Sequence, residues 1–149
     1  MPHDERTGVV LGWFKKAEND LKNISLVLPN PDCPFDTVCF HAQQAAEKYL
    51  KGLLIQLDVS FPKTHDIAKL LELVPEEVDL GLSIEDLAPL SRWAVFPRYP
   101  DFEEDLQRTD AETTVKLAQT VKAAVLDAVG RYGFNLDLLH RPTKTEEES

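Results

Sequence analysis

Residues 40–54, FHAQQAAEKYLKGLL, decide the fold of this chain. They belong to a longer stretch, Thr37–Leu57, in which apolar side chains recur at the spacing of one helix face. The alanines keep helix propensity high and let neighbouring helices approach closely, and only Gly52 weakens the pattern. The apolar surface is wider than a coiled-coil seam, so we predict a helix over 37–57 that contacts more than one neighbour. The predicted inward-facing residues are Ala42, Ala45, Tyr49 and Leu53, with Ala46, Leu50 and Leu57 beside them.

A helix is also predicted before this stretch, over 10–28. Its apolar face consists of Trp13, Ala17, Leu21, Ile24 and Leu28, at steps of three and four. Pro29 and Pro31 end this helix, because proline cannot continue the hydrogen-bond ladder.

Three more helices are predicted after the central stretch. Two short ones cover 65–74 and 83–94, with Thr64 and Ser83 as their N-caps. The last covers 110–132, opens with a capping box of Thr109 and Glu112, and ends at Gly130 or Gly133. Its predicted apolar stripe consists of Val115, Ala118, Val121, Val125 and Val129. The hairpin dipeptides Asn-Gly and Asp-Gly do not occur in the sequence. We therefore predict an all-α fold, an antiparallel up-and-down bundle of four to five helices.

The composition is that of one globular domain. The chain has 149 residues, of which 43% are hydrophobic and 28% are charged. We expect a flexible N-terminal segment over 1–9, a helical domain over 10–140 and a disordered acidic tail over 141–149. The N-terminus lacks the apolar core of a signal peptide, and no apolar run approaches the length of a membrane span. A cytoplasmic protein without a membrane partner is expected.

The charge is unevenly distributed along the chain. The net charge of −10 argues against general binding to DNA, which requires a basic surface. Residues 38–71 contain four lysines and three acids, a net of +1, whereas residues 72–112 contain twelve acids and three arginines, a net of −9. One locally basic segment in an acidic chain is better suited to a discrete phosphate or an acidic partner.

The candidate binding residues begin on the central helix. His41, Gln44, Lys48 and Lys51 follow helical spacing and share one polar stripe, with Gln43 and Glu47 in a second row. Ammonium and amide groups in a row can donate hydrogen bonds to phosphate oxygens or to a base edge. The alternative is a solvated helix face supported by a Glu47–Lys51 ion pair.

Two further segments carry candidate residues. Lys63 and His65 lie at a predicted helix start, where they could hold an anion, although His65 could equally anchor the loop through a side-chain hydrogen bond. Arg98 and Tyr99, between two prolines, suit phosphate binding and base stacking, unless Arg98 bridges the nearby carboxylates.

Cys33 and Cys39 lack metal-ligand companions and are interpreted as a semi-buried thiol and a loop thiol. We expect neither a metal nor a cofactor.

These segments resemble the HEPN domain, the higher eukaryotes and prokaryotes nucleotide-binding family. The resemblance rests on residues 40–54, on Thr64-His65-Asp66 with Leu70-Leu71, on Arg98-Tyr99-Pro100-Asp101 and on residues 13–21, and it spans about Trp13 to Gly133. It implies a helical bundle, commonly a homodimer with a cleft between subunits. Small prokaryotic members are often encoded beside a minimal nucleotidyltransferase, as a two-component module of toxin–antitoxin type.

The resemblance leaves three functions open. The first is a non-catalytic module that binds a nucleotide or a nucleotidyltransferase partner through His41, Gln44, Lys48, Lys51, Lys63, His65, Arg98 and Tyr99. The second is a metal-independent ribonuclease, weakened because nuclease-active members carry an arginine followed after four to six residues by a histidine, a spacing absent near Arg92 and Arg98. The third is a purely structural partner whose central helix is buried between two subunits.

Overall fold

The structure is a computed structural model that describes residues 1–94 and 106–140. Within these ranges the chain forms α-helices and short 3₁₀ turns and no strand. The elements are α1 (His3–Val27), α2 (Phe35–Gln56), α3 (Ile67–Glu72), α4 (Ile84–Ser91), η1 (Arg92–Ala94), α5 (Arg108–Arg131) and η3 (Leu136–His140). The predicted all-helical bundle is confirmed. The segments 98–99, predicted to bind phosphate and stack on a base, and 141–149, predicted to be a disordered tail, lie outside the described residues.

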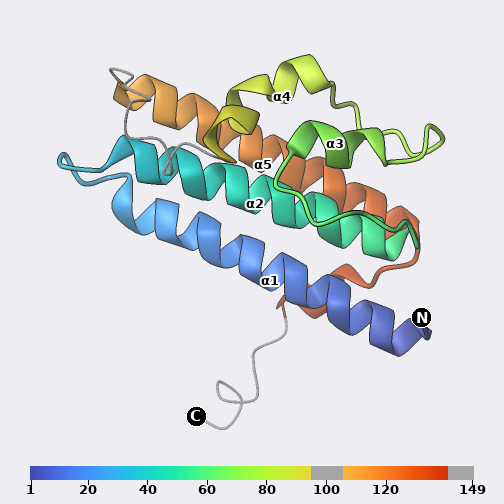
Figure 1. The fold of residues 1–149 in the computed structure, drawn as a ribbon. Helices are drawn as coiled ribbons and strands as arrows, with labels where there is room; N and C mark the ends of the chain where they lie inside the picture. The colour runs from blue at the N-terminus through green and yellow to red at the C-terminus, as the bar shows by residue number, and fades with distance from the viewer. Residues whose placement is uncertain (95–105, 141–149) are drawn as a thin grey trace, which may run out of the picture.

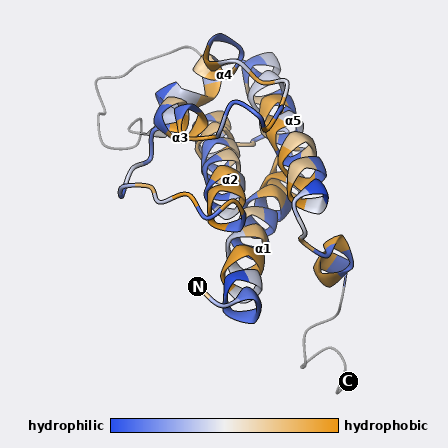
Figure 2. Ribbon diagram, turned by 90° about the vertical axis from the view of Figure 1, so that its right-hand side faces the viewer, coloured by the Kyte–Doolittle hydropathy of each residue, from blue (hydrophilic) through white to orange (hydrophobic). Residues whose placement is uncertain are grey.

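Helix α2 is the central element of the bundle. It packs against α1, α5, α3, α4 and η1, which confirms the prediction of several neighbours. Figure 2 shows α2 between α3 and α5, with α1 beneath it. One strip of the α2 surface, between α1 and the loop before α3, is not covered by these helices. The polar residues of α2 lie along this strip.

The direction of α5 departs from strict up-and-down alternation. Helix α1 runs antiparallel to α2, whereas α5 runs in the same direction as α2 (Figure 1). Two cross-links fix this arrangement. The Gln56 side chain, at the end of α2, donates to the carbonyl of Tyr132 at the end of α5 over 3.0 Å, and Arg108, at the start of α5, donates to the carbonyl of Asn30 over 2.9 Å. The segment with α3 and α4 returns the chain to the start of α2 before α5 begins.

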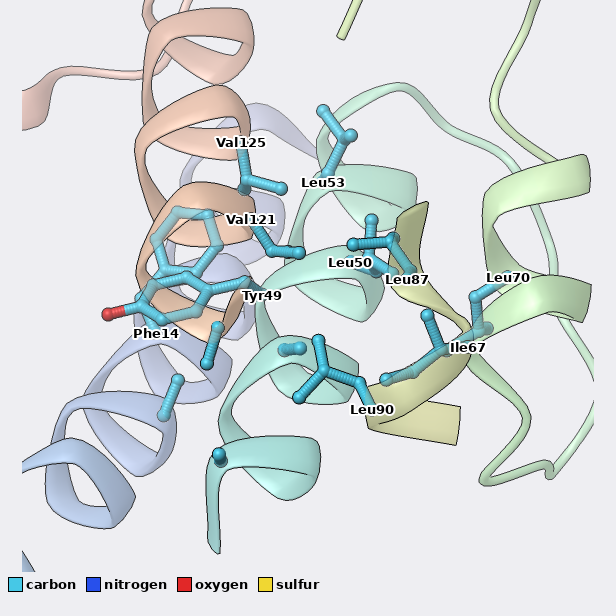
Figure 3. Packing of buried hydrophobic residues seen from close by; sticks show 14 of the residues in the cluster. Phe14, Tyr49, Leu50, Leu53, Ile67, Leu70, Leu87, Leu90, Val121 and Val125 are labelled. Carbon is cyan, nitrogen blue, oxygen red and sulfur yellow. The ribbon is translucent and has the colours of Figure 1, made fainter. Parts of the chain in front are cut away.

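The core lies where α1, α2 and α5 meet, and α3 and α4 extend it (Figure 3). The predicted apolar stripe of α5 is buried throughout, and so is that of α2 except for the half-buried Leu57. On α1, Ala17 and Ile24 are buried as predicted, whereas Trp13, Leu21 and Leu28 are only half-buried. Phe14, outside the predicted stripe, is fully buried. The Phe14 ring packs on Tyr49 with 5.6 Å between the ring centroids.

Gly52 lets α1 approach α2 at the Phe14 ring. A methyl group in its place would lie 2.5 Å from Cε1 of Phe14, which is closer than carbon atoms can approach. The glycine that weakens the helix pattern in the sequence is therefore required by packing.

The helix ends show which of the capping predictions are correct. Ser83 accepts from the amide of Asp86 and caps α4, as predicted. Gly133, with φ of +96°, ends α5, and the amide of Phe134 donates to the carbonyl of Val129 in the pattern of a Schellman motif. Three predictions were wrong. Asp66 and not Thr64 caps α3, Gln107 with Asp110 replaces Thr109 with Glu112 at α5, and α1 begins at His3 and not at residue 10.

Each correction has a local cause. The Asp66 carboxylate accepts from two amides of the first turn of α3, and the Thr64 hydroxyl instead accepts from the amide of Asp66 itself. Asp4 and Glu5 lie in the first turn of α1, where acidic side chains stabilise the positive end of the helix dipole. Residues 3–9 are therefore helical, although we predicted them to lie outside the helical domain.

Candidate functional site

The polar residues of α2 divide into two clusters, each built around one buried carboxylate. We name the first the Asp20 cluster, which consists of Asp20, His41 and Lys48. In it, Asp20 of α1 accepts from His41 Nδ1 over 2.9 Å and from Lys48 Nζ over 2.6 Å. The cluster therefore connects α1 to α2.

The second cluster connects α2 to the loop before α3. We name it the Glu47 cluster, and it consists of Gln43, Glu47, Lys51 and His65. Glu47 accepts from His65 Nδ1 over 2.9 Å and from Lys51 Nζ over 3.1 Å. The Gln43 amide donates to the carbonyl of His65 over 2.9 Å, so the loop is fixed through both backbone and side chain. This agrees with the structural interpretation of His65, as an anchor of the loop.

Lys51 does not present its ammonium group to solvent. Its side chain is 9% exposed, and that of Glu47 is 3% exposed. The Lys51 ammonium lies 5.3 Å from the centroid of the Trp13 ring and 6.0 Å from that of Phe61, within the range of cation–π contacts for the first ring. The Glu47–Lys51 pair is present as the sequence indicated, but it is buried and not part of a solvated face.

The remaining predicted residues fall into three groups. His41, Gln44 and Lys48 form a partly accessible edge of α2, which we name the α2 edge, and the Gln44 amide donates to the side chain of Gln43 over 2.7 Å. Lys63 and His65 are exposed on the following loop. Arg98 and Tyr99 lie outside the described residues. The ligand-binding role of all these residues stays a prediction.

The hydrogen bonds identify the ring nitrogen that carries the hydrogen in both histidines. A carboxylate accepts hydrogen bonds and donates none, so Nδ1 of His41 and of His65 must carry the proton. In the neutral ring Nε2 then keeps its lone pair and can accept a proton or a hydrogen bond. The two imidazoles belong to different carboxylates, and the clusters do not share a residue.

Asp20 is the functional residue that sequence reasoning missed. It stands three residues after Ala17 and four before Ile24, which are both buried on the same face of α1. A charged residue in the register of the core is expected to have a charged partner, because an unpaired charge is costly to bury. That signal was present in the sequence, but it does not identify the partners, which lie 21 and 28 residues further along the chain.

A third polar contact joins all three long helices. The Tyr49 hydroxyl donates to Glu18, which also pairs with Lys122 of α5 over 2.8 Å. Burial, followed by the hydrogen bond to Glu18, raises the pKa of Tyr49 well above its usual value. Tyr49 therefore stays protonated and serves as a donor in the core.

The two cysteine thiols are not accessible as nucleophiles. Cys33 and Cys39 are both free and buried, so the loop residue Cys33 is less accessible than predicted. Burial raises the pKa of Cys39 to about 11, which disfavours the reactive thiolate. Within residues 1–94 and 106–140, no three His, Cys, Asp or Glu side chains come together as metal ligands. No helix in the same ranges combines the length and the hydrophobicity needed to cross a membrane.

Comparison with known proteins gives a family and a structural neighbour. The family model described as the HEPN domain matches residues 10–128. The crystal structure of TT1696 from Thermus thermophilus is similar, with a TM-score of 0.68 and 30% sequence identity, over 80% of this chain and 97% of that chain. No curated protein matches the chain.

Proposed function

The chain belongs to the HEPN domain family, and on this premise we propose that it is a non-catalytic binding module that associates with a separate minimal nucleotidyltransferase through the α2 edge. The association would form a two-component module of toxin–antitoxin type. The edge consists of His41, Gln44 and Lys48, and the exposed His65 lies on the adjoining loop.

The observation that supports a protein partner is the neutralised charge of both clusters. Lys48 is paired with Asp20 and Lys51 with Glu47, so neither ammonium group is available as a surplus positive charge. A phosphate that approached Lys48 would compete with a carboxylate that is already 2.6 Å from the ammonium nitrogen. A fixed, nearly neutral set of donors and acceptors is better suited to the polar surface of a protein.

The test requires a minimal nucleotidyltransferase encoded by a neighbouring reading frame, which is then co-purified with this chain. Gln44→Arg places a bulky charge on the α2 edge, and we expect it to weaken the complex by about tenfold or more in calorimetry. Gln119→Arg is the matched control, because Gln119 is an exposed residue of α5. Equal affinities of the two variants, or the absence of any complex, would contradict the proposal.

Nucleotide binding is the other half of the proposed binding function. The exposed Lys63 and His65, with exposed Lys69 in the same basic segment, are the groups that remain able to meet a phosphate. Calorimetry with ATP, GTP and their monophosphates tests this, with Lys63→Glu expected to reduce any affinity. No heat and no thermal shift with any of the four would remove nucleotide binding from the proposal.

A ribonuclease is the second candidate, and the Asp20–His41 pair favours it. A buried carboxylate that holds an imidazole by Nδ1 leaves Nε2 directed away as a general base, which is how such pairs act in catalysis. Incubation with single-stranded and structured RNA, beside His41→Ala and His65→Ala, tests this candidate. Cleavage lost with His41→Ala alone would support it, and cleavage that survives both substitutions would assign the activity to a contaminant or another site.

The third candidate is a purely structural homodimer, in which a second copy covers the α2 edge in place of a nucleotidyltransferase. Sedimentation velocity of the wild type and of Lys48→Glu tests whether the α2 edge contributes. We expect Lys48→Glu to shift a dimer to monomers while circular dichroism stays helical. An unchanged sedimentation coefficient would place the dimer contact elsewhere.

A further inference from the structure

A cavity lies between α1, α5 and η3, apart from both clusters of α2. Its volume is about 550 Å³, within the range of small-molecule sites. Leu126 of α5 and Leu136 and Leu139 of η3 form its apolar wall. Helix η3 follows α5 at the side of the bundle (Figure 2) and contacts α1, and residues of these three elements line the cavity.

The polar groups of this cavity carry a positive surplus. Glu18 lines it, but this carboxylate already pairs with Lys122 over 2.8 Å and accepts from Tyr49. Lys15 also lines the cavity, and it has no ion-pair partner among the described residues. His140 adds an imidazole at the end of η3. Lys15 is exposed, so its ammonium group is available to a ligand that lies against the leucine wall.

We propose that this cavity binds a small organic anion with an apolar body. The Lys15 ammonium would pair with the acid group, and the three leucines would cover the body. The Lys15 charge would orient the ligand, and contact with the apolar wall would supply most of the affinity. Small-molecule sites usually combine a few polar groups and an apolar lining in this way. The site does not overlap the α2 edge, so its ligand and the proposed protein partner can be tested separately.

The probe is 8-anilinonaphthalene-1-sulfonate, an apolar aromatic anion whose fluorescence rises on binding. With the full chain we expect saturable binding at one site, displaced by octanoate and not by octanol. Lys15→Glu should weaken binding by about tenfold, since it replaces attraction with repulsion. Lys116→Glu is the matched control, because it makes the same charge change at an exposed position of α5 outside the cavity; its affinity should stay within about twofold.

A second variant tests the apolar wall. Leu139→Asp places a carboxylate among the leucines and should abolish probe binding, while circular dichroism reports whether the helices are retained. If this variant does not fold, the Lys15→Glu and Lys116→Glu pair decides. Three results would overturn the proposal: no saturable binding, equal affinities for the two lysine variants, or displacement by octanol as effective as by octanoate. A wild-type dimer that excludes the probe, and that Leu139→Asp separates into monomers, would also overturn it by assigning this face to a second copy.

Discussion

The Asp20 cluster and the Glu47 cluster contain the same three kinds of group, a carboxylate, an imidazole and an ammonium. The two clusters differ in how far the imidazole and the ammonium are exposed to solvent. In the Glu47 cluster the lysine is sealed, at 9% side-chain exposure, and the histidine is open, at 57%. In the Asp20 cluster both are partly accessible, with Lys48 at 20% and His41 at 30%. The ion pair of the Glu47 cluster lies within one helix, whereas that of the Asp20 cluster joins two helices.

This difference in exposure distinguishes a structural role for the Glu47 cluster from the recognition role that we propose for the α2 edge. Lys51 lies among aromatic rings and cannot turn toward water without rearrangement of Trp13 and Phe61. Lys48 and His41 already reach the surface, so a partner can contact them without unfolding anything. Under the proposed function, the polar residues of one helix would serve two purposes, and their exposure, not their identity, would decide which.

The largest effect is expected when the sealed pair is broken. Glu47→Gln leaves the Lys51 charge buried without a counter-charge and should lower the free energy of unfolding by about 3–5 kcal/mol in urea titrations. Adding Lys51→Met to this variant removes the stranded charge and should recover most of the loss. A loss below about 1 kcal/mol for the single variant would show that Lys51 reaches water and would remove the contrast between the clusters.

The corresponding change in the other cluster should cost less. Asp20→Asn should lower the free energy of unfolding by about 1–3 kcal/mol, because Lys48 and His41 can turn toward solvent when they lose their negatively charged acceptor. Asp127→Asn is the control, since Asp127 pairs with Arg131 at the surface and should contribute less than about 0.5 kcal/mol. An Asp20→Asn loss as large as that of Glu47→Gln would mean that both clusters are structural.

Gly52 allows the two clusters to be disturbed unequally. Gly52→Ala forces the Phe14 ring away from α2 and should cost about 1–2 kcal/mol, the strain of overpacking less the gain in helix propensity. Asp20 of α1 bonds His41 directly, whereas α1 reaches His65 only through the contact of Trp13 with Lys51. The imidazole NMR signals of His41 should therefore shift more than those of His65. Gly12→Ala is the control with the opposite sign, since Gly12 faces open space and should gain up to about 1 kcal/mol. Equal shifts at both histidines would show that α1 does not move as expected.

Most of the fold, but only part of the site, could be predicted from the sequence. Helix periodicity predicted α2 and the buried face of α5 because each rests on spacing within a single segment. The Glu47–Lys51 pair was predictable for the same reason, being an i,i+4 contact. The Asp20 contacts depend on how α1 is rotated and how close it lies to α2, which are set by tertiary packing such as that of Phe14 on Gly52. The direction of α5 likewise depends on the path of the chain through α3 and α4.

The smallest expected effect is a difference in salt dependence between the two clusters. Raising NaCl from about 0.1 M to about 1 M shortens the screening length from about 10 Å to about 3 Å, which weakens attraction between charges that water and ions can approach. The stability difference between wild type and Asp20→Asn should therefore shrink by a few tenths of a kcal/mol, roughly the range of partly exposed pairs. The difference between wild type and Glu47→Gln should stay constant, because ions do not enter the space between Glu47 and Lys51. General effects of salt on folding cancel in both stability differences. If the two differences depended equally on salt, Lys48 would be as inaccessible as Lys51, and the α2 edge would have no accessible cation.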